Sequence, residues 1–460
     1  MTTQAFRRIH FVGVGGAGLS ALARLALLQG YAVSGSDRTR TEIVGDLEQL
    51  GLGFQEGHEP EAVRTTDVVV ASSAIAADNA ELEWARAHGL VVWKRHEFLP
   101  WLTRGKRVVA VSGTHGKTTT TALLAHVLTE TGRDPTCLVG GVLRAWASNA
   151  RLGQSDLFVL EADEYDRTFL SLSPWLGVIT SVEMDHPDCY GSLAELTSAF
   201  EQFAARCQRL LASADDERAS ATAARLGGRA QTYGWHGDAA WRLLTWRGDP
   251  AGSAFRFRDP QGREDEGWVP LWGRHSVANA LAAIAAAVAA GVPVMEALAA
   301  LGSFAGVERR FTSSGTFAGV DIVDDYAHHP SQIVATVAAA RQRFPGRRVV
   351  VVFQPHTFSR LAALYADYVA ALREADIAFV LPVYGARETG DAGGAATALA
   401  RDAGAQALPG VDTAAAALVT ELRPGDVVLN LGAGDGEELT VALAERLSRY
   451  HKESCTLLVV

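Results

Sequence analysis

A glycine-rich segment in the first third of the chain carries the strongest chemical signal. The stretch VVAVSGTHGKTTTT, residues 108–121, predicts a buried strand that runs into a turn and then into a helix. Backbone N–H groups in such a turn face a phosphate, a lysine reaches the outer phosphates and a threonine hydroxyl can bind magnesium. Lys117 and Thr118 have the types and the spacing for these roles. The general motif has glycine where this chain has Val111, so the match is to a shortened phosphate-binding loop.

Acidic residues follow the next apolar strand. The stretch SDLFVLEADEYD contains Glu161, Asp163 and Glu164 after its apolar run. Acids at a strand end beside a phosphate-binding loop commonly hold magnesium, and the alternative is a solvated strand end. A further strand ends in VEMDHPD, where His186 lies between two aspartates. On chemistry alone, His186 is either an ordinary histidine or a ligand of a second metal ion.

Two more clusters of polar residues lie in the last third of the chain. VDDYAHHP places Asp325, Tyr326 and His328 after one strand, and FQPHTFSR places His356 and Arg360 after the next. Open α/β sheets bind ligands at the carboxyl ends of their strands. The guanidinium of Arg360 is suited to a carboxylate, because it can pair with both oxygens.

The N-terminal stretch FVGVGGAGLS, residues 11–20, contains the pattern G-x-G-x-x-G. After a strand and before a helix, this pattern is the fingerprint of dinucleotide binding. Asp37, at the end of the next strand, stands where a ribose-binding acid is expected. The first hypothesis from this stretch alone is a nicotinamide-dependent oxidoreductase.

Short apolar strands alternate with helical patterns through three successive regions, which predicts an α/β protein with mainly parallel sheets. The polar stretch TRGK at 103–106 and the arginine-containing stretch FAGVERRFTSSG at 304–315 predict two joints. We therefore expect three domains. They are a Rossmann-like domain at 1–104, a central domain resembling phosphate-loop ATPases at 105–308, and a second Rossmann-like domain at 309–460.

The composition of the chain argues against several classes of protein. Its 460 residues are 48% hydrophobic and carry a formal net charge of -10, which argues against a sequence-independent grip on nucleic acid. The four cysteines show neither C-x-x-C pairs nor zinc-ligand spacing. The N-terminus has no signal-peptide pattern, and the longest apolar run is shorter than the roughly 20 residues that span a bilayer. We expect a cytoplasmic enzyme that binds neither nucleic acid nor membrane.

Taken together, the motifs resemble those of the Mur ligases of peptidoglycan synthesis, three-domain ATP-dependent enzymes that form amide bonds. The stretches that carry the resemblance follow one another in the family's order over nearly the whole chain. They are GVGGAGLS, SGSD, SSAI, GTHGKTTT, EADEYD, DHPD, GRHSVAN, FAGVERRF, DDYAHHP and FQPHTFSR. The pattern is most similar to the branch that ligates L-alanine to UDP-N-acetylmuramate through an acyl phosphate, with ATP and two Mg²⁺ ions.

The resemblance implies roles for individual residues. The N-terminal loop would hold UDP rather than NAD, a choice that the fingerprint leaves open. The implied UDP-sugar site is Gly15, Gly16, Ala17, Gly18, Ser20, Asp37 and Ser72. The implied ATP site is Gly113, Thr114, His115, Gly116, Lys117, Thr118, Thr119, His275, Asn279, Arg310 and Asp325. The implied metal ligands are Thr118, Glu161 and His186, and the implied amino-acid site is Tyr326, His328, His356 and Arg360.

Among these residues, the resemblance implies catalytic roles for Lys117, Glu161, His186, His328 and Arg360. His328 would assist with the proton of the amine. His186 would be a metal ligand rather than a base, because phosphoryl transfer depends mostly on positioning and charge stabilisation.

The chain also departs from the family pattern at three places. Many members carry a carbamylated lysine beyond the DH motif, but this chain has no lysine between Lys117 and Lys452, as is usual in the L-alanine branch. Thr357 stands where some members have arginine, so the expected amino-acid site relies more on Arg360. Ser181 stands where asparagine is usual.

Two alternatives remain open. One is the recycling ligase that attaches an intact tripeptide to the same UDP-sugar, since it shares most of these motifs. The other is a nucleotide-binding relative without turnover, against which the intact set of loop and metal residues argues. The expected partners are the small molecules UDP-N-acetylmuramate, L-alanine and ATP, and we expect a monomer or a weak homodimer.

Overall fold

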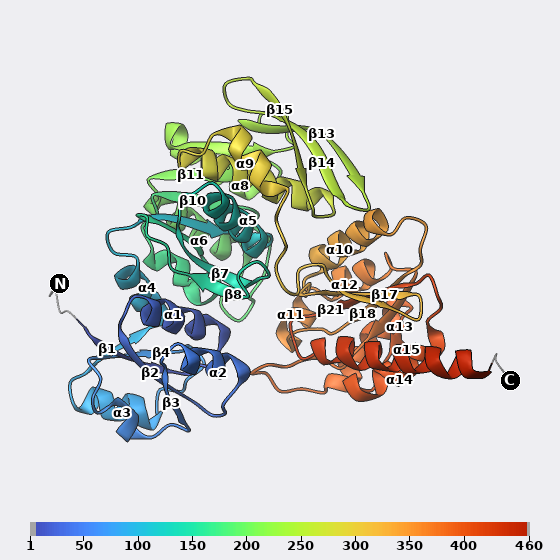
Figure 1. The fold of residues 1–460 in the computed structure, drawn as a ribbon, viewed down its shortest axis with the longest axis horizontal. Helices are drawn as coiled ribbons and strands as arrows, with labels where there is room; N and C mark the ends of the chain where they lie inside the picture. Colours follow the sequence, from blue (N-terminus) through green and yellow to red (C-terminus); the bar gives the residue numbers. More distant parts are fainter. Residues whose placement is uncertain (1–5, 458–460) are drawn as a thin grey trace. The chain divides into compact units, whose positions relative to one another are not determined.

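The computed structural model describes residues 6–457 and contains three β-sheets flanked by helices (Figure 1). Contacts within the chain divide it into two compact units. The first unit contains the first sheet and most of the central sheet. The second contains the outer hairpin of the central sheet and the third sheet. Three sheets in an α/β arrangement confirm the predicted fold class.

The first sheet is entirely parallel, with the strand order β3-β2-β1-β4-β5. Its strands are β1 (Arg8–Val12), β2 (Ala32–Asp37), β3 (Gly53–Glu56), β4 (Val68–Ala71) and β5 (Val91–Lys94). Its helices are α1 (Ala17–Leu28), α2 (Glu42–Gln49), α3 (Ala80–Ala87) and α4 (Arg95–Leu102), with a 3-10 helix at Pro60–Val63. The strand order reverses beside β1, so the glycine loop after β1 lies where doubly wound sheets bind ligands.

The central sheet has ten strands in the order β15-β14-β13-β12-β11-β10-β6-β9-β7-β8. Neighbouring strands from β13 to β7 are parallel, and antiparallel pairs occupy both edges. The strands are β6 (Arg107–Ser112), β7 (Thr136–Leu143), β8 (Ser148–Arg151), β9 (Leu157–Glu161), β10 (Leu176–Ile179), β11 (Arg209–Ser213), β12 (Ala230–Gly234), β13 (Trp241–Asp249), β14 (Gly252–Arg258) and β15 (Glu264–Val269). Because β6 lies between β10 and β9, the segments that follow these three strands meet at one edge.

The helices of this region follow its strands along the chain. They are α5 (Lys117–Glu130), α6 (Leu193–Arg206), α7 (Glu217–Leu226), α8 (Arg274–Ala289) and α9 (Val294–Leu301), with 3-10 helices at Tyr165–Ser171 and Gly227–Arg229. Within residues 6–457, no helix combines the length and the apolar character needed to cross a bilayer.

The third sheet has the order β16-β17-β21-β18-β19-β20 and is parallel except for the pair β16–β17. Its strands are β16 (Thr312–Phe317), β17 (Val320–Asp325), β18 (Val349–Phe353), β19 (Ile377–Val380), β20 (Gln406–Ala407) and β21 (Val427–Leu431). Its helices are α10 (Pro330–Arg343), α11 (Phe358–Ala363), α12 (Tyr365–Leu372), α13 (Ala392–Ala403), α14 (Val411–Glu421) and α15 (Glu437–Leu457). Successive residues of β18 point to opposite faces, and each face has its own buried apolar cluster.

One expectation about this third region is wrong in detail. The apolar run after Arg360 predicts one helix, but the structure has α11 and α12, separated at Leu364 with φ -118° and ψ 23°. The segment at 304–315, which is predicted to be a joint, also contains the start of β16 at Thr312. Polar and glycine residues dominate β16, TSSGTF, so its pairing with β17 is not visible in the sequence.

Candidate active site

The phosphate-binding loop connects β6 to α5 and requires glycine at two positions. Gly116 caps the start of α5 with φ 78°, and Gly113 has φ 132°. A Cβ on Gly113 would lie 2.0 Å from the hydroxyl oxygen of Thr180. Ser181 accepts a hydrogen bond from the backbone N–H of His115 at 3.1 Å. The loop is thus closed against the segment that follows β10, and this contact gives the unusual serine at 181 a structural role.

Lys117 is held at the start of α5 by a buried carboxylate. Its Nζ donates to both carboxylate oxygens of Glu164, at 2.8 and 2.7 Å, and Glu164 is fully buried. Burial lowers the pKa of Lys117, but the neighbouring carboxylates, Glu164 first, outweigh this and raise the pKa above its ordinary value. Lys117 therefore carries its positive charge before any nucleotide binds.

Thr118 and Glu161 form a pair of oxygen donors beside this lysine. The Thr118 hydroxyl donates to Glu161 Oε1 at 3.0 Å, and the backbone N–H of Gly140 donates to Glu161 Oε2 at 2.7 Å. Hydroxyl and carboxylate oxygens suit Mg²⁺, which keeps several waters and takes few protein ligands. Two of the three predicted metal ligands are therefore brought together, and their chemistry fits the ion.

The other predicted nucleotide residues lie at helix starts. Thr119 is in the first turn of α5, and His275 is exposed in the first turn of α8. Asn279, one turn later in α8, is buried. A Cβ on Gly116 would lie 2.6 Å from Asn279 Oδ1, so Asn279 packs directly on the phosphate-binding loop.

The N-terminal glycine loop is fastened to the end of β2. The backbone N–H groups of Gly13 and Val14 donate to the Ser36 carbonyl, at 2.8 and 3.1 Å. Gly15 N–H donates to Asp37 Oδ2 at 2.8 Å, so this predicted pair is in direct contact. Ser72 follows β4, and its Cβ would be 3.2 Å from a Cβ placed on Gly13. Gly16 caps α1, and Ala17, Gly18 and Ser20 lie in the first turn of that helix.

Arg360 and His186 are connected through Asp185. Arg360 is buried, and its Nε donates to Asp185 Oδ1 at 2.7 Å. Its Nη1 donates to the carbonyl oxygen and to Nδ1 of His356, at 2.8 and 3.0 Å, while Nη2 has no partner among the described residues. Burial raises the pKa of the Asp185 carboxyl, but His186 and Arg360 outweigh it and hold the pKa well below its usual value. The guanidinium is thus partly used by the protein, with Nε and Nη1 bonded to Asp185 and His356.

His328 has a defined tautomer. Its Nδ1 lies 2.9 Å from the Tyr326 carbonyl oxygen, which can only accept, so Nδ1 carries a hydrogen. Burial lowers the pKa of His328 well below its ordinary value, and the charge of Arg360 adds to the effect. The ring is therefore neutral near pH 7, with Nε2 free of its proton. Burial likewise lowers the pKa of His356, to about 4.

Asp325 is tied to the backbone around it. Its two carboxylate oxygens accept from the N–H groups of Phe311 and Ala327, at 2.7 and 2.8 Å. Burial raises the pKa of Asp325 to about 6, although the charge of Arg310 opposes this. The Arg310 guanidinium lies 5.2 Å from the centre of the Tyr326 ring. Asp325 and Arg310 therefore order the segment around the predicted joint, and their contact with ATP remains a prediction.

Comparison with protein families covers nearly the whole chain. Residues 8–107 match the model "Mur ligase family, catalytic domain", residues 111–287 match "Mur ligase middle domain" and residues 309–434 match "Mur ligase, glutamate ligase domain". The chain belongs to the Mur ligase family. Among curated Mur ligases, "UDP-N-acetylmuramate--L-alanine ligase" of Roseiflexus sp. (strain RS-1) is 44% identical over 96% of this chain and 99% of its own length. The protein with that description in Myxococcus xanthus is 41% identical over 97% of this chain and 96% of its own length.

A solved Mur ligase structure has the same architecture. The UDP-N-acetylmuramate-alanine ligase of Thermotoga maritima has a TM-score of 0.82 and 30% sequence identity, with 97% of this chain and all of that chain covered. The murein peptide ligase of Psychrobacter arcticus has a TM-score of 0.72 and 26% identity, with 96% and 99% covered.

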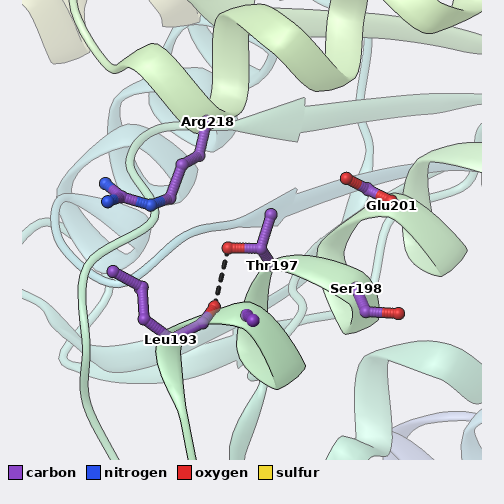
Figure 2. A pocket seen from close by; sticks show the side chains of 6 residues that line it. Leu193, Thr197, Ser198, Glu201 and Arg218 are labelled. Carbon is purple, nitrogen blue, oxygen red and sulfur yellow. Dashed lines mark hydrogen bonds between the residues drawn. The ribbon is translucent and has the colours of Figure 1, made fainter.

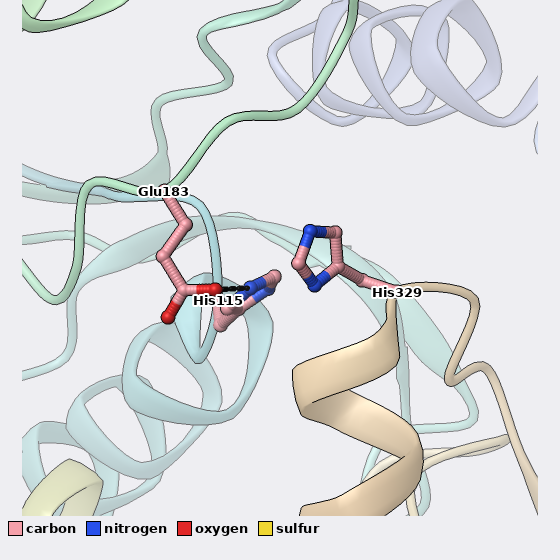
Figure 3. Close-up of side chains that lie close together, drawn as sticks. All are labelled: His115, Glu183 and His329. Atoms are coloured by element: carbon pink, nitrogen blue, oxygen red, sulfur yellow. Dashed lines mark hydrogen bonds and ion pairs between the residues drawn. The ribbon is translucent and has the colours of Figure 1, made fainter. Parts of the chain in front are cut away.

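Glu183 of this Mur ligase touches the phosphate-binding loop and is not singled out by the sequence analysis. His115 Nε2 lies 3.2 Å from Glu183 Oε2 (Figure 3). The Thr114 hydroxyl donates to the Glu183 carbonyl at 3.1 Å and accepts from the Glu183 N–H at 2.9 Å. Glu183 follows β10, and it meets the loop because β10 pairs with β6. Local sequence patterns do not reveal which strands are paired.

A surface hollow on α6 and α7 lies apart from these residues in the sequence. Leu193, Thr197, Ser198, Glu201 and Arg218 line it, and the Thr197 hydroxyl donates within its own helix to the Leu193 carbonyl (Figure 2). None of the predicted site residues lines this hollow.

Proposed function

We propose that this Mur ligase joins L-alanine to the lactyl carboxylate of UDP-N-acetylmuramate and converts ATP to ADP and phosphate. The observation that carries the proposal is the 44% identity, over 96% of the chain, to a relative named for this reaction. The murein peptide ligase is less similar, at 26% identity, so attachment of an intact tripeptide is the second candidate. The charged phosphate-binding loop favours an enzyme over a binding protein without turnover.

The first step activates the acid. A lactyl carboxylate oxygen attacks the γ-phosphorus of ATP, the bond from that phosphorus to the bridging oxygen breaks, and ADP leaves with that oxygen. Lys117 would neutralise the negative charge of the γ-phosphate oxygens. Its ion pair with Glu164 already keeps it positively charged. Thr118 and Glu161 would hold Mg²⁺, which supplies positive charge to the phosphate oxygens when bound. His186 is the proposed ligand of a second ion.

The second step forms the amide. The neutral amine of L-alanine attacks the carbonyl carbon of the acyl phosphate to form a tetrahedral intermediate. The bond from that carbon to the phosphate oxygen then breaks, and phosphate leaves with the proton that the nitrogen loses. His328 would accept a hydrogen bond from the amine at Nε2, because Nδ1 donates to the Tyr326 carbonyl. The low pKa of His328 makes it a weak base, so we assign it to orienting the amine. Nη2 of Arg360 would bind the amino-acid carboxylate beside Tyr326 and His356.

The proposal divides the substrates among three domains. Residues 1–104 would hold the UDP part through the glycine loop, Asp37 and Ser72. Residues 105–308 would hold ATP, and residues 309–460 would hold the amino acid. We further propose that the enzyme works in the cytoplasm, as a monomer or a weak homodimer.

A direct assay tests the function. ADP release is measured with UDP-N-acetylmuramate and Mg²⁺ present, and L-alanine, glycine, L-serine or the tripeptide is added in turn. The proposal expects the highest kcat/KM with L-alanine. A preference for the tripeptide would favour recycling, and no ADP release with any acceptor would favour a binding protein.

A further inference from the structure

A buried cluster of charged and polar side chains lies among β1, β2 and α3 and contains none of the predicted contact residues. Glu81, in the first turn of α3, has no exposed surface. Its Oε2 accepts from the Ser36 hydroxyl at 2.7 Å and lies 3.2 Å from His58 Nδ1. Its Oε1 lies 3.6 Å from Nε2 of His10, which is also buried. One carboxylate therefore gathers side chains from β1, β2 and the segment after β3.

This cluster is poorly explained by stability alone. Three of its buried atoms, His10 Nε2, His58 Nε2 and Glu81 Oε1, have no hydrogen-bond partner among the described residues, although the first and the last form an ion pair at 3.6 Å. A buried polar group without a full set of partners costs free energy that an apolar side chain of similar shape would avoid. Burial raises the pKa of Glu81, but the His10 and Ser36 contacts outweigh it and lower the pKa. The carboxylate is therefore charged, and the fold retains it at a cost.

The contacts of Glu81 lead directly to the glycine loop. The Ser36 hydroxyl bonds to Glu81, and the Ser36 carbonyl accepts the N–H groups of Gly13 and Val14. The residue after Ser36 is Asp37, whose carboxylate accepts the Gly15 N–H. The Asp37 carbonyl accepts the N–H of residue 57 at 2.8 Å, just before His58. Glu81 thus contacts both Ser36, at the end of β2, and His58, which follows the residue that is bonded to Asp37.

We infer that Glu81, through its hydrogen bond to Ser36, is a positioning residue that sets the geometry of the glycine loop for binding a uridine diphosphate group. The inference rests on the proposed function, because it takes that group as the ligand of the loop. Backbone N–H groups bind a pyrophosphate only when they converge on its oxygens. A small displacement of the end of β2 would turn these N–H groups away from one another and weaken binding. Glu81 itself does not touch the ligand.

Calorimetry with UDP-N-acetylmuramate tests the inference on the full-length chain. Glu81→Ala removes the carboxylate, and Ser36→Ala removes only the hydroxyl that reaches it. Both should weaken UDP-sugar binding by about tenfold, the size of one well-placed hydrogen bond, and leave ATP binding within about twofold. In turnover, KM for the UDP-sugar should rise while kcat stays close to that of the parent chain. Glu83→Gln is the matched control, since Glu83 is exposed on the same turn of α3.

The outcomes separate the inference from the function. A parent chain that does not bind UDP-N-acetylmuramate would sink the proposed function. A parent chain that binds it, together with folded variants that bind equally well, would overturn the role of Glu81 even if their melting temperatures fall. If Glu81→Ala does not fold, Ser36→Ala decides the question alone, because it deletes a single oxygen.

Discussion

The two glycine loops of this protein have the same topology and differ in the charged side chains that contact them. Each follows a parallel strand and caps a helix, the first at Gly16 and the second at Gly116. Around the second loop, Lys117 pairs with Glu164 and Thr118 pairs with Glu161. The first loop has no lysine, and its Gly15 amide is bound by Asp37. The two loops therefore share a backbone arrangement that suits an anion, and they differ in the charged side chains that chemistry would require.

The comparison predicts its largest effect at Lys117. Lys117→Ala should lower the rate of ADP formation by about a thousandfold, because charge stabilisation carries phosphoryl transfer. UDP-sugar binding, followed by calorimetry, should stay unchanged, since the two loops belong to different sheets. Lys106→Ala is the control, because Lys106 Nζ donates only to a backbone carbonyl, that of Ser155. Loss of UDP-sugar affinity in Lys117→Ala would contradict the assignment of ATP and the UDP-sugar to different loops.

A second prediction concerns the buried pair itself. Glu164→Gln removes the nearest negative charge from Lys117 and leaves Asp163 Oδ1 at 4.0 Å. The free energy of unfolding should therefore fall, by up to about 3 to 5 kcal/mol in the absence of nucleotide. Urea denaturation measures this, and ATP with Mg²⁺ should restore part of the loss by supplying new negative charge. Asp156→Asn breaks the exposed pair with Arg107 and should cost no more than about 1 kcal/mol. Equal losses of unfolding free energy in both variants would mean that the buried Lys117–Glu164 pair stabilises the fold no more than an exposed pair does.

The third prediction sharpens the role of the first loop. Asp37→Asn weakens a charge-assisted hydrogen bond to Gly15, so UDP-sugar affinity should fall by about tenfold while ATP affinity is kept. Asp46→Asn, at an exposed site on α2, is the control. Tighter UDP-sugar binding in Asp37→Asn would show instead that the Asp37 carboxylate competes with phosphate for the Gly15 amide.

The smallest effect is expected at Ser181. Ser181→Ala removes the acceptor of the His115 N–H, which should lower the free energy of unfolding by about 1 kcal/mol and leave kcat nearly unchanged. Ser198→Ala, exposed on α6, is the control. A large fall in kcat would mean that Ser181 contributes to catalysis and not only to the shape of the loop.

Much of the site could be predicted from local sequence, but the hydrogen bonds and ion pairs between its side chains could not. The glycine spacing and Lys117 predict a phosphate-binding loop because a turn needs only adjacent residues. Local sequence does not distinguish the three acids at the end of β9, which are Glu161, Asp163 and Glu164. The structure separates them, with Glu161 bonded to Thr118 and Glu164 bonded to Lys117. Such contacts depend on which strands are neighbours, and local patterns do not carry that information.

The same limit applies to elements and to single side chains. The strand β3, GFQE, has four residues and none of them is buried, so it lacks the apolar pattern that predicts a strand. Arg360 was expected to be available to a substrate carboxylate, and the structure shows its Nε already on Asp185. Nothing near Arg360 in the sequence indicates this partner, which is separated from it by 175 positions.

The sequence by itself determined the class of fold, the order of the motifs and the positions of the two glycine loops between a strand and a helix. These properties depend on periodicity, on glycine at strained backbone positions and on residues within one turn of each other. Only the tertiary structure decided which acid faces which cation, which side chains Glu81 contacts, and which proton His328 keeps. Those outcomes depend on burial and on strand order, because the energy of a buried charge is set by neighbours that are far away along the chain.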